Sequence, residues 1–171
     1  MNPELLIGRL EAFAYRLRQL VKDLPADQAR WRPAEGGMSI LEIVGNLCDR
    51  ETLEFRPRLE LTLRDPERPW PRVEPDDGLD ELNYNERELE REAEKFQRER
   101  LKSVQWLRSL GAANWTATHE EPKLGPIRAG DLLVSWASHD ALMTSASARR
   151  SYDLSQRDAP GFSSAYVGEW G

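Results

Sequence analysis

Four stretches of the chain have the apolar spacing of amphipathic helices. The first opens with a possible N-cap at Asn2 and with Pro3, and it ends before Pro25, because the residue preceding a proline is pushed out of the helical region. Its apolar stripe advances in steps of four and three residues: Leu6, Leu10, Phe13, Leu17, Leu20 and Leu24. Such a stripe predicts a helix that packs nearly parallel to its neighbours.

The second stretch begins at Ser39, which can form a capping box with Glu42. The buried stripe of this helix is expected to be Ile40, Ile43, Val44 and Leu47. The helical pattern continues to about Leu63, and we expect Pro57 to kink the helix or to end it early.

The third and longest stretch runs from about Asp80 to Leu110 and is ended by Gly111. Acidic and basic residues interleave from Glu86 to Arg100, which is typical of a solvated helix face. The side predicted to be buried consists of Leu89, Ala93, Phe96, Val104 and Leu107.

The fourth stretch, Leu132 to Arg150, contains neither glycine nor proline. Its residues Leu132, Trp136, His139, Met143 and Ala146 recur at helical spacing and are predicted to share one face. His139 is one of two histidines in the protein. On an apolar face it is either a metal-binding or acid–base group, or a structural residue with its hydrogen bonds satisfied.

The connections are irregular. Residues 64–78 hold four prolines and a glycine, and they form either a lid or a plain crossover, in which Trp70 could pack back over the core. Residues 114–127 show no convincing strand pattern. After Arg150 the aromatic residues Phe162, Tyr166 and Trp170 suggest a tail that folds against the body. Together these patterns predict an all-α four-helix bundle with a long crossover connection and an irregular C-terminal tail.

Composition narrows the class of protein. The 171 residues are expected to form a single domain, residues 1–171. A net charge of −6 argues against nucleic acid as a partner. There is no signal-peptide pattern and no apolar run of the ~18 residues that a membrane span needs. With Cys48 as the sole cysteine, no internal disulfide can form, and we expect a cytoplasmic protein.

Two segments resemble the DinB-like (DinB/YfiT-like) superfamily of metalloenzymes. The first holds Trp31-Arg-Pro33 and then Gly37-Met-Ser-Ile-Leu-Glu-Ile-Val-Gly-Asn-Leu-Cys-Asp-Arg-Glu51. The second holds His119, Gly125-Pro-Ile, Leu132-Leu and Trp136-Ala-Ser-His-Asp140. The segments span nearly the whole chain in the order that the family has. The resemblance implies a four-helix bundle that is often homodimeric.

The resemblance also implies a metal site. In active members three histidines bind nickel or zinc, one on the second helix and two on the fourth, and some relatives are thiol-dependent transferases. The matching positions here are Asn46, His139 and Met143, so only His139 keeps the histidine. An amide oxygen and a thioether are poor ligands for zinc or nickel. No bound cofactor is therefore expected.

Few nearby side chains could replace the missing metal ligands. Cys48 and Asp140 should point away from the ligand positions, whereas Asp49 could reach the same region. A lone cysteine on an apolar helix is more often buried and inert than nucleophilic. His119 is expected to form a hydrogen bond in its connector rather than to act in catalysis.

Two hypotheses follow. In the first, the protein is a non-catalytic binding or scaffold protein, dimeric like its family, in which Asn46, His139 and Met143 line a pocket or are packed as core. In the second, it is a metal- or thiol-dependent S-transferase or hydrolase that uses substitute ligands. The sequence favours the first, because two of the three ligands are missing. It names neither the substrate nor the ligand.

Overall fold

The computed structural model describes residues 2–72, 82–168 and 170. Its elements, in chain order, are α1 (Pro3–Val21), α2 (Ala26–Arg30), α3 (Ile40–Asp49), the π-helix η1 (Arg50–Phe55), α4 (Arg56–Arg64), the 3₁₀-helix η3 (Tyr84–Glu86), α5 (Leu89–Ser109), β1 (Thr118–Glu121), β2 (Gly125–Arg128) and α6 (Ala129–Asp158). None of the described helices is long and apolar enough to cross a membrane.

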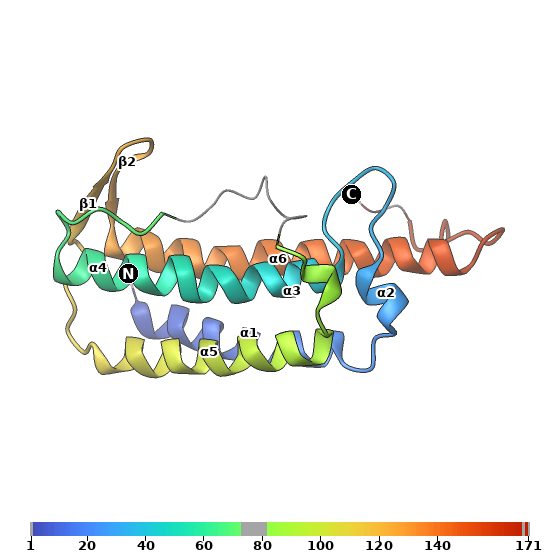
Figure 1. Cartoon of the computed structure of the whole chain (residues 1–171), viewed down its shortest axis with the longest axis horizontal. Helices are drawn as coiled ribbons and strands as arrows, with labels where there is room; N and C mark the ends of the chain where they lie inside the picture. Colours follow the sequence, from blue (N-terminus) through green and yellow to red (C-terminus); the bar gives the residue numbers. More distant parts are fainter. Residues whose placement is uncertain (1, 73–81, 169, 171) are drawn as a thin grey trace.

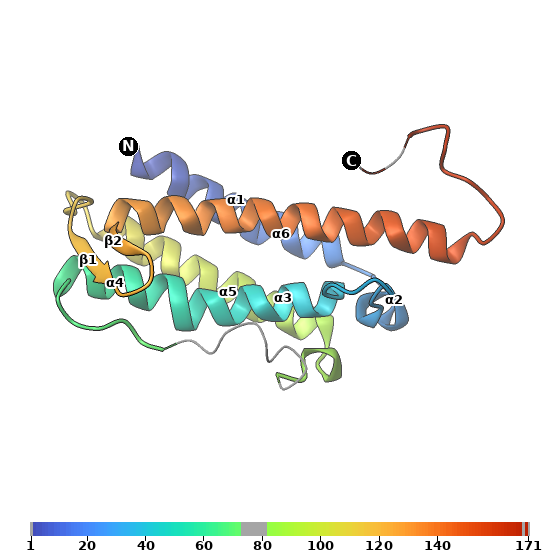
Figure 2. The same ribbon diagram turned by 90° about the horizontal axis from the view of Figure 1, so that it is seen from above.

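The predicted four-helix bundle is confirmed. Its members are α1, the continuous run α3–η1–α4, α5 and α6 (Figures 1 and 2). Both α1 and α3 pack against α5 and against α6. In Figure 1, α4 ends at the left end of the bundle and α5 begins at the right end. The connection between them must therefore span the length of the bundle, which makes it the long crossover expected from the sequence.

The second bundle helix begins as its sequence predicts. Ser39 and Glu42 form a reciprocal capping box at the start of α3. The helix does not end at Pro57 but changes to the wider π geometry over Arg50–Phe55 and resumes as α4, with Pro57 in its first turn. Pro57 has no N–H to donate to the preceding turn, and the π-helical segment lies directly before it in the chain.

The third helix starts later than predicted. The sequence placed its start near Asp80, but α5 begins at Leu89, and the described residues before it form a turn and η3. Asn83 adopts a left-handed conformation with φ of 50°. A right-handed α-helix cannot run through a residue in this conformation. The predicted buried side of the helix is confirmed in full, because Leu89, Ala93, Phe96, Val104 and Leu107 are all buried.

The connector before α6 contains a hairpin that the sequence analysis missed. Strands β1 and β2 pair antiparallel, with His119 opposite Ile127 and Glu121 opposite Gly125. Each strand has four residues, and β2 contains Pro126, so the local pattern was too short and too broken to indicate strands. The hairpin leads directly into α6, which begins at Ala129.

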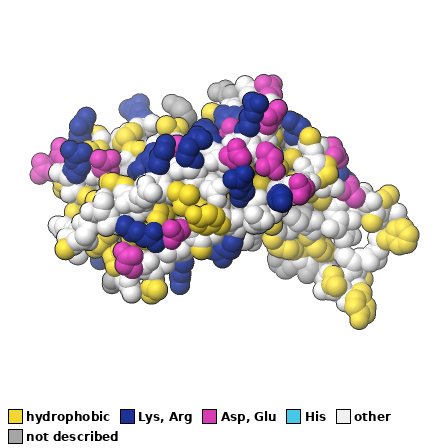
Figure 3. Space-filling view, turned by 90° about the horizontal axis from the view of Figure 1, so that it is seen from below, with side chains coloured by type: hydrophobic (Ala, Val, Ile, Leu, Met, Phe, Trp, Pro, Cys, Tyr) yellow, Lys and Arg dark blue, Asp and Glu magenta, His cyan; other side chains and the backbone are white. Residues whose placement is uncertain are grey.

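The C-terminal prediction is only partly right. Helix α6 extends eight residues beyond Arg150, to Asp158. Past it, Phe162 and Tyr166 are 84% and 101% exposed, so these side chains do not fold against the body. Figure 3 shows hydrophobic side chains on this protruding end, while charges of both signs are interspersed over the rest of that face. The ring of Trp170 contacts that of Tyr152, with centroids 5.8 Å apart.

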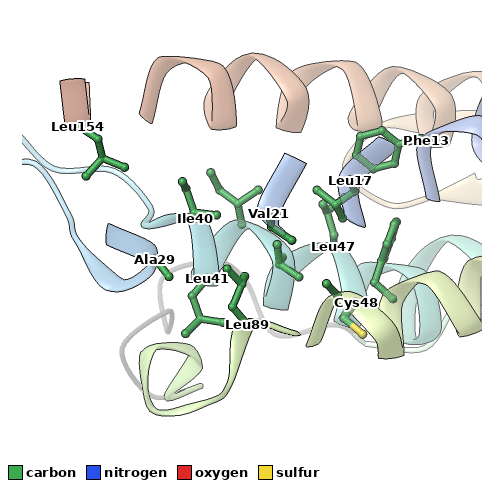
Figure 4. Packing of buried hydrophobic residues seen from close by; sticks show 14 residues of the cluster. Phe13, Leu17, Val21, Ala29, Ile40, Leu41, Leu47, Cys48, Leu89 and Leu154 are labelled. Atoms are coloured by element: carbon green, nitrogen blue, oxygen red, sulfur yellow. The ribbon is translucent and has the colours of Figure 1, made fainter. Parts of the chain in front are cut away.

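The core consists of two apolar clusters. The first gathers side chains from α1, α2, α3, α5 and the end of α6, among them Phe13, Leu47, Cys48 and Phe96 (Figure 4). The second lies towards the hairpin and includes Phe55, Leu59 and Trp136. The guanidinium carbon of Arg100 lies 4.8 Å from the ring of Phe96 and 5.6 Å from that of Trp136. The guanidinium of Arg100 therefore lies where the two clusters meet.

Candidate functional site

The most unusual feature of the bundle interior is a buried cluster of three charged side chains. Arg100 of α5 donates from Nε to Glu51 Oε2 at 2.8 Å. Its two terminal nitrogens donate to the two carboxylate oxygens of Asp140, at 2.6 and 2.9 Å. The side chains of Arg100, Glu51 and Asp140 are 1%, 0% and 6% exposed. The cluster links η1, α5 and α6 inside the bundle.

An aromatic layer adjoins the cluster. Trp136 donates from Nε1 to Glu51 Oε2 at 2.9 Å. Its ring stacks on Phe55, with centroids 5.6 Å apart and planes at 7°. Phe55 also contacts His139, and their ring centroids lie 5.4 Å apart. A chain of contacts therefore runs from Arg100 to His139.

Burial shifts the pKa values of the cluster. Burial, aided by Glu51, raises the pKa of Asp140 to about 6, against the opposing effect of Arg100. Burial also disfavours the charged form of Arg100, but Glu51 and Asp140 outweigh it and raise the pKa of the guanidinium. Two carboxylates share one cation, and Glu51 Oε1 is buried without a hydrogen-bond partner among the described residues.

The three family ligand positions lie on the two helices that the resemblance assigned. Asn46 is buried in α3, at 6% exposure. His139 and Met143 are partly buried in α6, one turn apart. Met143 packs against the apolar cluster that contains Leu47, and His139 against Phe55. His139 thus lies at the edge of the buried face of α6, and its neighbour Asp140 occupies the interior.

These residues do not fit a nickel or zinc ion. Asn46 and Met143 offer an amide and a thioether where the family has imidazoles, which leaves His139 as the single strong ligand of the set. Among the residues that the structure describes, no group of three His, Cys, Asp or Glu side chains could hold a metal ion.

The candidate replacements are engaged elsewhere. Asp140 is held at both oxygens by Arg100. Asp49, which the sequence analysis allowed near Asn46, accepts a hydrogen bond from the Tyr84 hydroxyl at 2.8 Å and lies 3.9 Å from Lys95 Nζ, so it faces α5 and η3 instead. Its two carboxylate oxygens thus contact Tyr84 of η3 and Lys95 of α5.

Cys48 is buried in the first apolar cluster. Desolvation raises the pKa of its thiol to about 12, so almost no thiolate is present near neutral pH. The expectation of a buried cysteine is confirmed.

His119 joins the hairpin to the connection after α4. Its Nδ1 donates to the backbone oxygen of Pro66 at 2.7 Å. Its ring stacks on that of Trp70, with centroids 4.3 Å apart. Trp70 itself donates from Nε1 to Thr62 of α4 at 3.1 Å. Both sequence expectations are confirmed: His119 has a hydrogen-bonding role, and Trp70 packs back over the core. The proposed lid of residues 64–78 falls partly outside the described residues.

The sequence pattern does not identify Arg100 and Glu51 as site residues. Arg100 was counted with the solvated face of its helix, although it lies four residues after Phe96 and four before Val104, on the buried stripe. An arginine at a core position of such a stripe is a signal for a buried anionic partner. Which carboxylates pair with it could not be read from the spacing.

Comparison with known proteins identifies the fold and the family. The structure is similar to that of YfiT from Bacillus subtilis, described as a probable metal-dependent hydrolase with an unusual four-helix bundle topology. The TM-score is 0.78 over 90% of this chain and 87% of that one, with 18% sequence identity, which establishes a shared fold. A comparison with curated protein sequences finds no match. The model of the DinB superfamily matches residues 9–142, and the chain therefore belongs to that superfamily.

Proposed function

We propose that this protein is a non-catalytic binding or scaffold member of the DinB superfamily that works without a metal ion. The observation that carries the proposal is the engagement of both Asp140 oxygens by Arg100, at 2.6 and 2.9 Å. Asp140 is the carboxylate nearest to His139 in the chain, and because Arg100 engages both of its oxygens it is not available as a substitute metal ligand. Asn46 and Met143 do not supply one.

Metal analysis tests the proposal. Protein purified with nickel and zinc available should carry no stoichiometric metal, and His139→Ala should change stability only. His119→Ala is the matched control, because it removes the other histidine, which lies in the hairpin. About one tightly held ion per chain that is lost in His139→Ala but kept in His119→Ala contradicts the proposal.

The competing function is a metal- or thiol-dependent S-transferase or hydrolase. It is tested by offering the protein small thiols and electrophiles, with and without added nickel or zinc. We expect no turnover above the uncatalysed rate. Turnover that His139→Ala abolishes while the fold is retained would establish the competing function instead.

We also propose that the protein acts as a homodimer through the outward face of α6, within the cytoplasm. The exposed residues of α6 from 134 to 148 include no charged side chain, although 32% of the chain is charged. They are Val134, Ser135, Ser138, Ala141, Leu142, Thr144 and Ser145. Depletion of charge is typical of the centre of a protein interface. The buried, unpaired Cys48 suits a reducing compartment.

Light scattering tests the dimer. The wild type should have twice the chain mass of 19.7 kDa. Leu142→Arg should reduce it to one chain, because it places a charge in the proposed interface. Leu5→Arg, at a similarly exposed leucine of α1, should leave the mass unchanged. A mass of one chain for the wild type at all concentrations excludes the dimer.

A further inference from the structure

The charged cluster connects the two helical segments that hold the family's ligand positions. Glu51 lies in η1, which continues α3 directly, and Asp140 follows His139 in α6. Arg100 reaches both carboxylates from α5. We propose that the guanidinium of Arg100 is the built-in cation of this bundle, which joins α3–η1 to α6 as a metal held between those helices would.

The shape of the guanidinium suits this role. All three of its nitrogens donate: Nε to Glu51, and the terminal pair to Asp140. One terminal nitrogen also donates to the backbone oxygen of Leu10 in α1, at 3.3 Å. A planar fork with fixed donor directions holds these acceptors in one arrangement, which a lysine ammonium could not reproduce. Arg100 therefore connects all four members of the bundle.

The surroundings strengthen the cross-link. The rings of Phe13, Phe96 and Trp136 lie 5.8, 4.8 and 5.6 Å from the guanidinium carbon. They surround a side chain that is 1% exposed, so water screens its charge very little. Trp136 also donates to Glu51 and so fixes one of the two carboxylates.

Removing the cation should separate the helices that it joins. Without Arg100, the carboxylates of Glu51 and Asp140 would be buried opposite each other with no positive charge between them. The loss of stability from these unpaired carboxylates should affect η1 and the middle of α6 most, since those segments carry Glu51 and Asp140. Neutralising all three groups removes that cost together with the cross-link.

Three variants test the inference. Arg100→Met should lower the thermal midpoint by roughly 6–20 °C. Arg108→Met is the matched control on the same helix, because Arg108 makes a two-bond contact to Glu11 of α1 at the surface. It should lower the midpoint by less than about 4 °C. The triple variant Glu51→Gln/Arg100→Met/Asp140→Asn should recover most of the loss seen in Arg100→Met.

Hydrogen exchange supplies a readout that global stability does not. In Arg100→Met the loss of protection should concentrate in η1 and around Asp140, rather than in α5, where the substitution lies. The inference is overturned if Arg100→Met matches Arg108→Met, if the triple variant is no more stable than Arg100→Met, or if protection is lost evenly.

This inference rests on the proposed metal-independent site, but the two fail separately. A stoichiometric metal lost in His139→Ala overturns the proposed function. A harmless Arg100→Met overturns the cross-link, whatever the metal content.

Discussion

Asp140 presents both carboxylate oxygens to Arg100, at 2.6 and 2.9 Å, while Glu51 must share the same guanidinium through a single oxygen. Two buried carboxylates therefore depend on one cation. The arrangement joins three helical segments, but it also places two carboxylates beside one guanidinium in the bundle interior. Its consequences can be measured as changes in stability.

The titration of Asp140 should make the free energy of unfolding depend on pH. Burial raises the pKa of Asp140 from 3.8 to about 6, so between these pH values the folded chain holds a proton that the unfolded chain has lost. The contribution of Asp140 to the free energy of unfolding is therefore greatest below pH 3.8 and falls by up to about 3 kcal/mol as the pH rises past 6.

Urea unfolding of the wild type and of Asp140→Asn from pH 4 to pH 8 measures this contribution. The stability of the wild type relative to the variant should decline up to pH 6 and then stay level. Asp27→Asn, which removes an exposed carboxylate, is the control for the loss of charge. A difference between wild type and Asp140→Asn that does not vary with pH would show that Asp140 titrates normally.

Trp136→Phe should destabilise the protein through Glu51. The variant keeps an aromatic ring against Phe55 but removes the indole N–H that donates to Glu51 Oε2 at 2.9 Å. A buried carboxylate that loses a donor should lower the free energy of unfolding by roughly 1–3 kcal/mol. Denaturant unfolding followed by circular dichroism measures it. Trp106→Phe, at a partly buried position, should cost less, and equal losses would contradict the assigned hydrogen bond.

Gly45→Ala tests the close approach of η3 to α3. A Cβ at Gly45 would lie 2.2 Å from Cδ1 of Tyr84, whose ring is buried. The ring must move, and the expected loss is about 1–3 kcal/mol of unfolding free energy. Gly8→Ala in α1 is the matched control, because nothing lies within 4 Å of the added carbon. In Gly8→Ala the free energy of unfolding should rise by about 0.5–1 kcal/mol. If Gly45→Ala is stabilised in the same way, the contact between Gly45 and Tyr84 is disproved.

The hairpin should hold the start of the crossover through His119. In His119→Ala both the stacking on Trp70 and the hydrogen bond to Pro66 are lost. We expect trypsin to cleave after Arg72 faster in this variant than in the wild type, because residues 66–72 lose their attachment. His119→Phe keeps the stacking and should give an intermediate rate. Unchanged cleavage in His119→Ala would show that Trp70 alone retains the segment.

Much of the candidate site was visible in the residue types. Asn46 and Met143 stand at the positions in the chain where the family has histidines. Their side chains alone already predict weak binding of zinc or nickel. The commitment of Asp140 and the direction of Asp49 could not be predicted. Each depends on a partner from another helix, Arg100 in one case and Tyr84 in the other.

The sequence alone determined the four bundle helices and most positions on their apolar sides, because a helical period of 3.6 residues is a local property that a stripe such as Leu89–Phe96 records directly. In α1 the predicted stripe is wrong at its end, because Leu20 is exposed and the helix stops at Val21, before Leu24. The tertiary structure decided which polar side chains are buried beside those apolar faces and which short segments pair as strands. It placed Arg100 on a buried stripe between Glu51 and Asp140, and it paired two strands too short to show a period. A buried charge is stabilised only by partners that folding brings from distant parts of the chain, and no local pattern contains them.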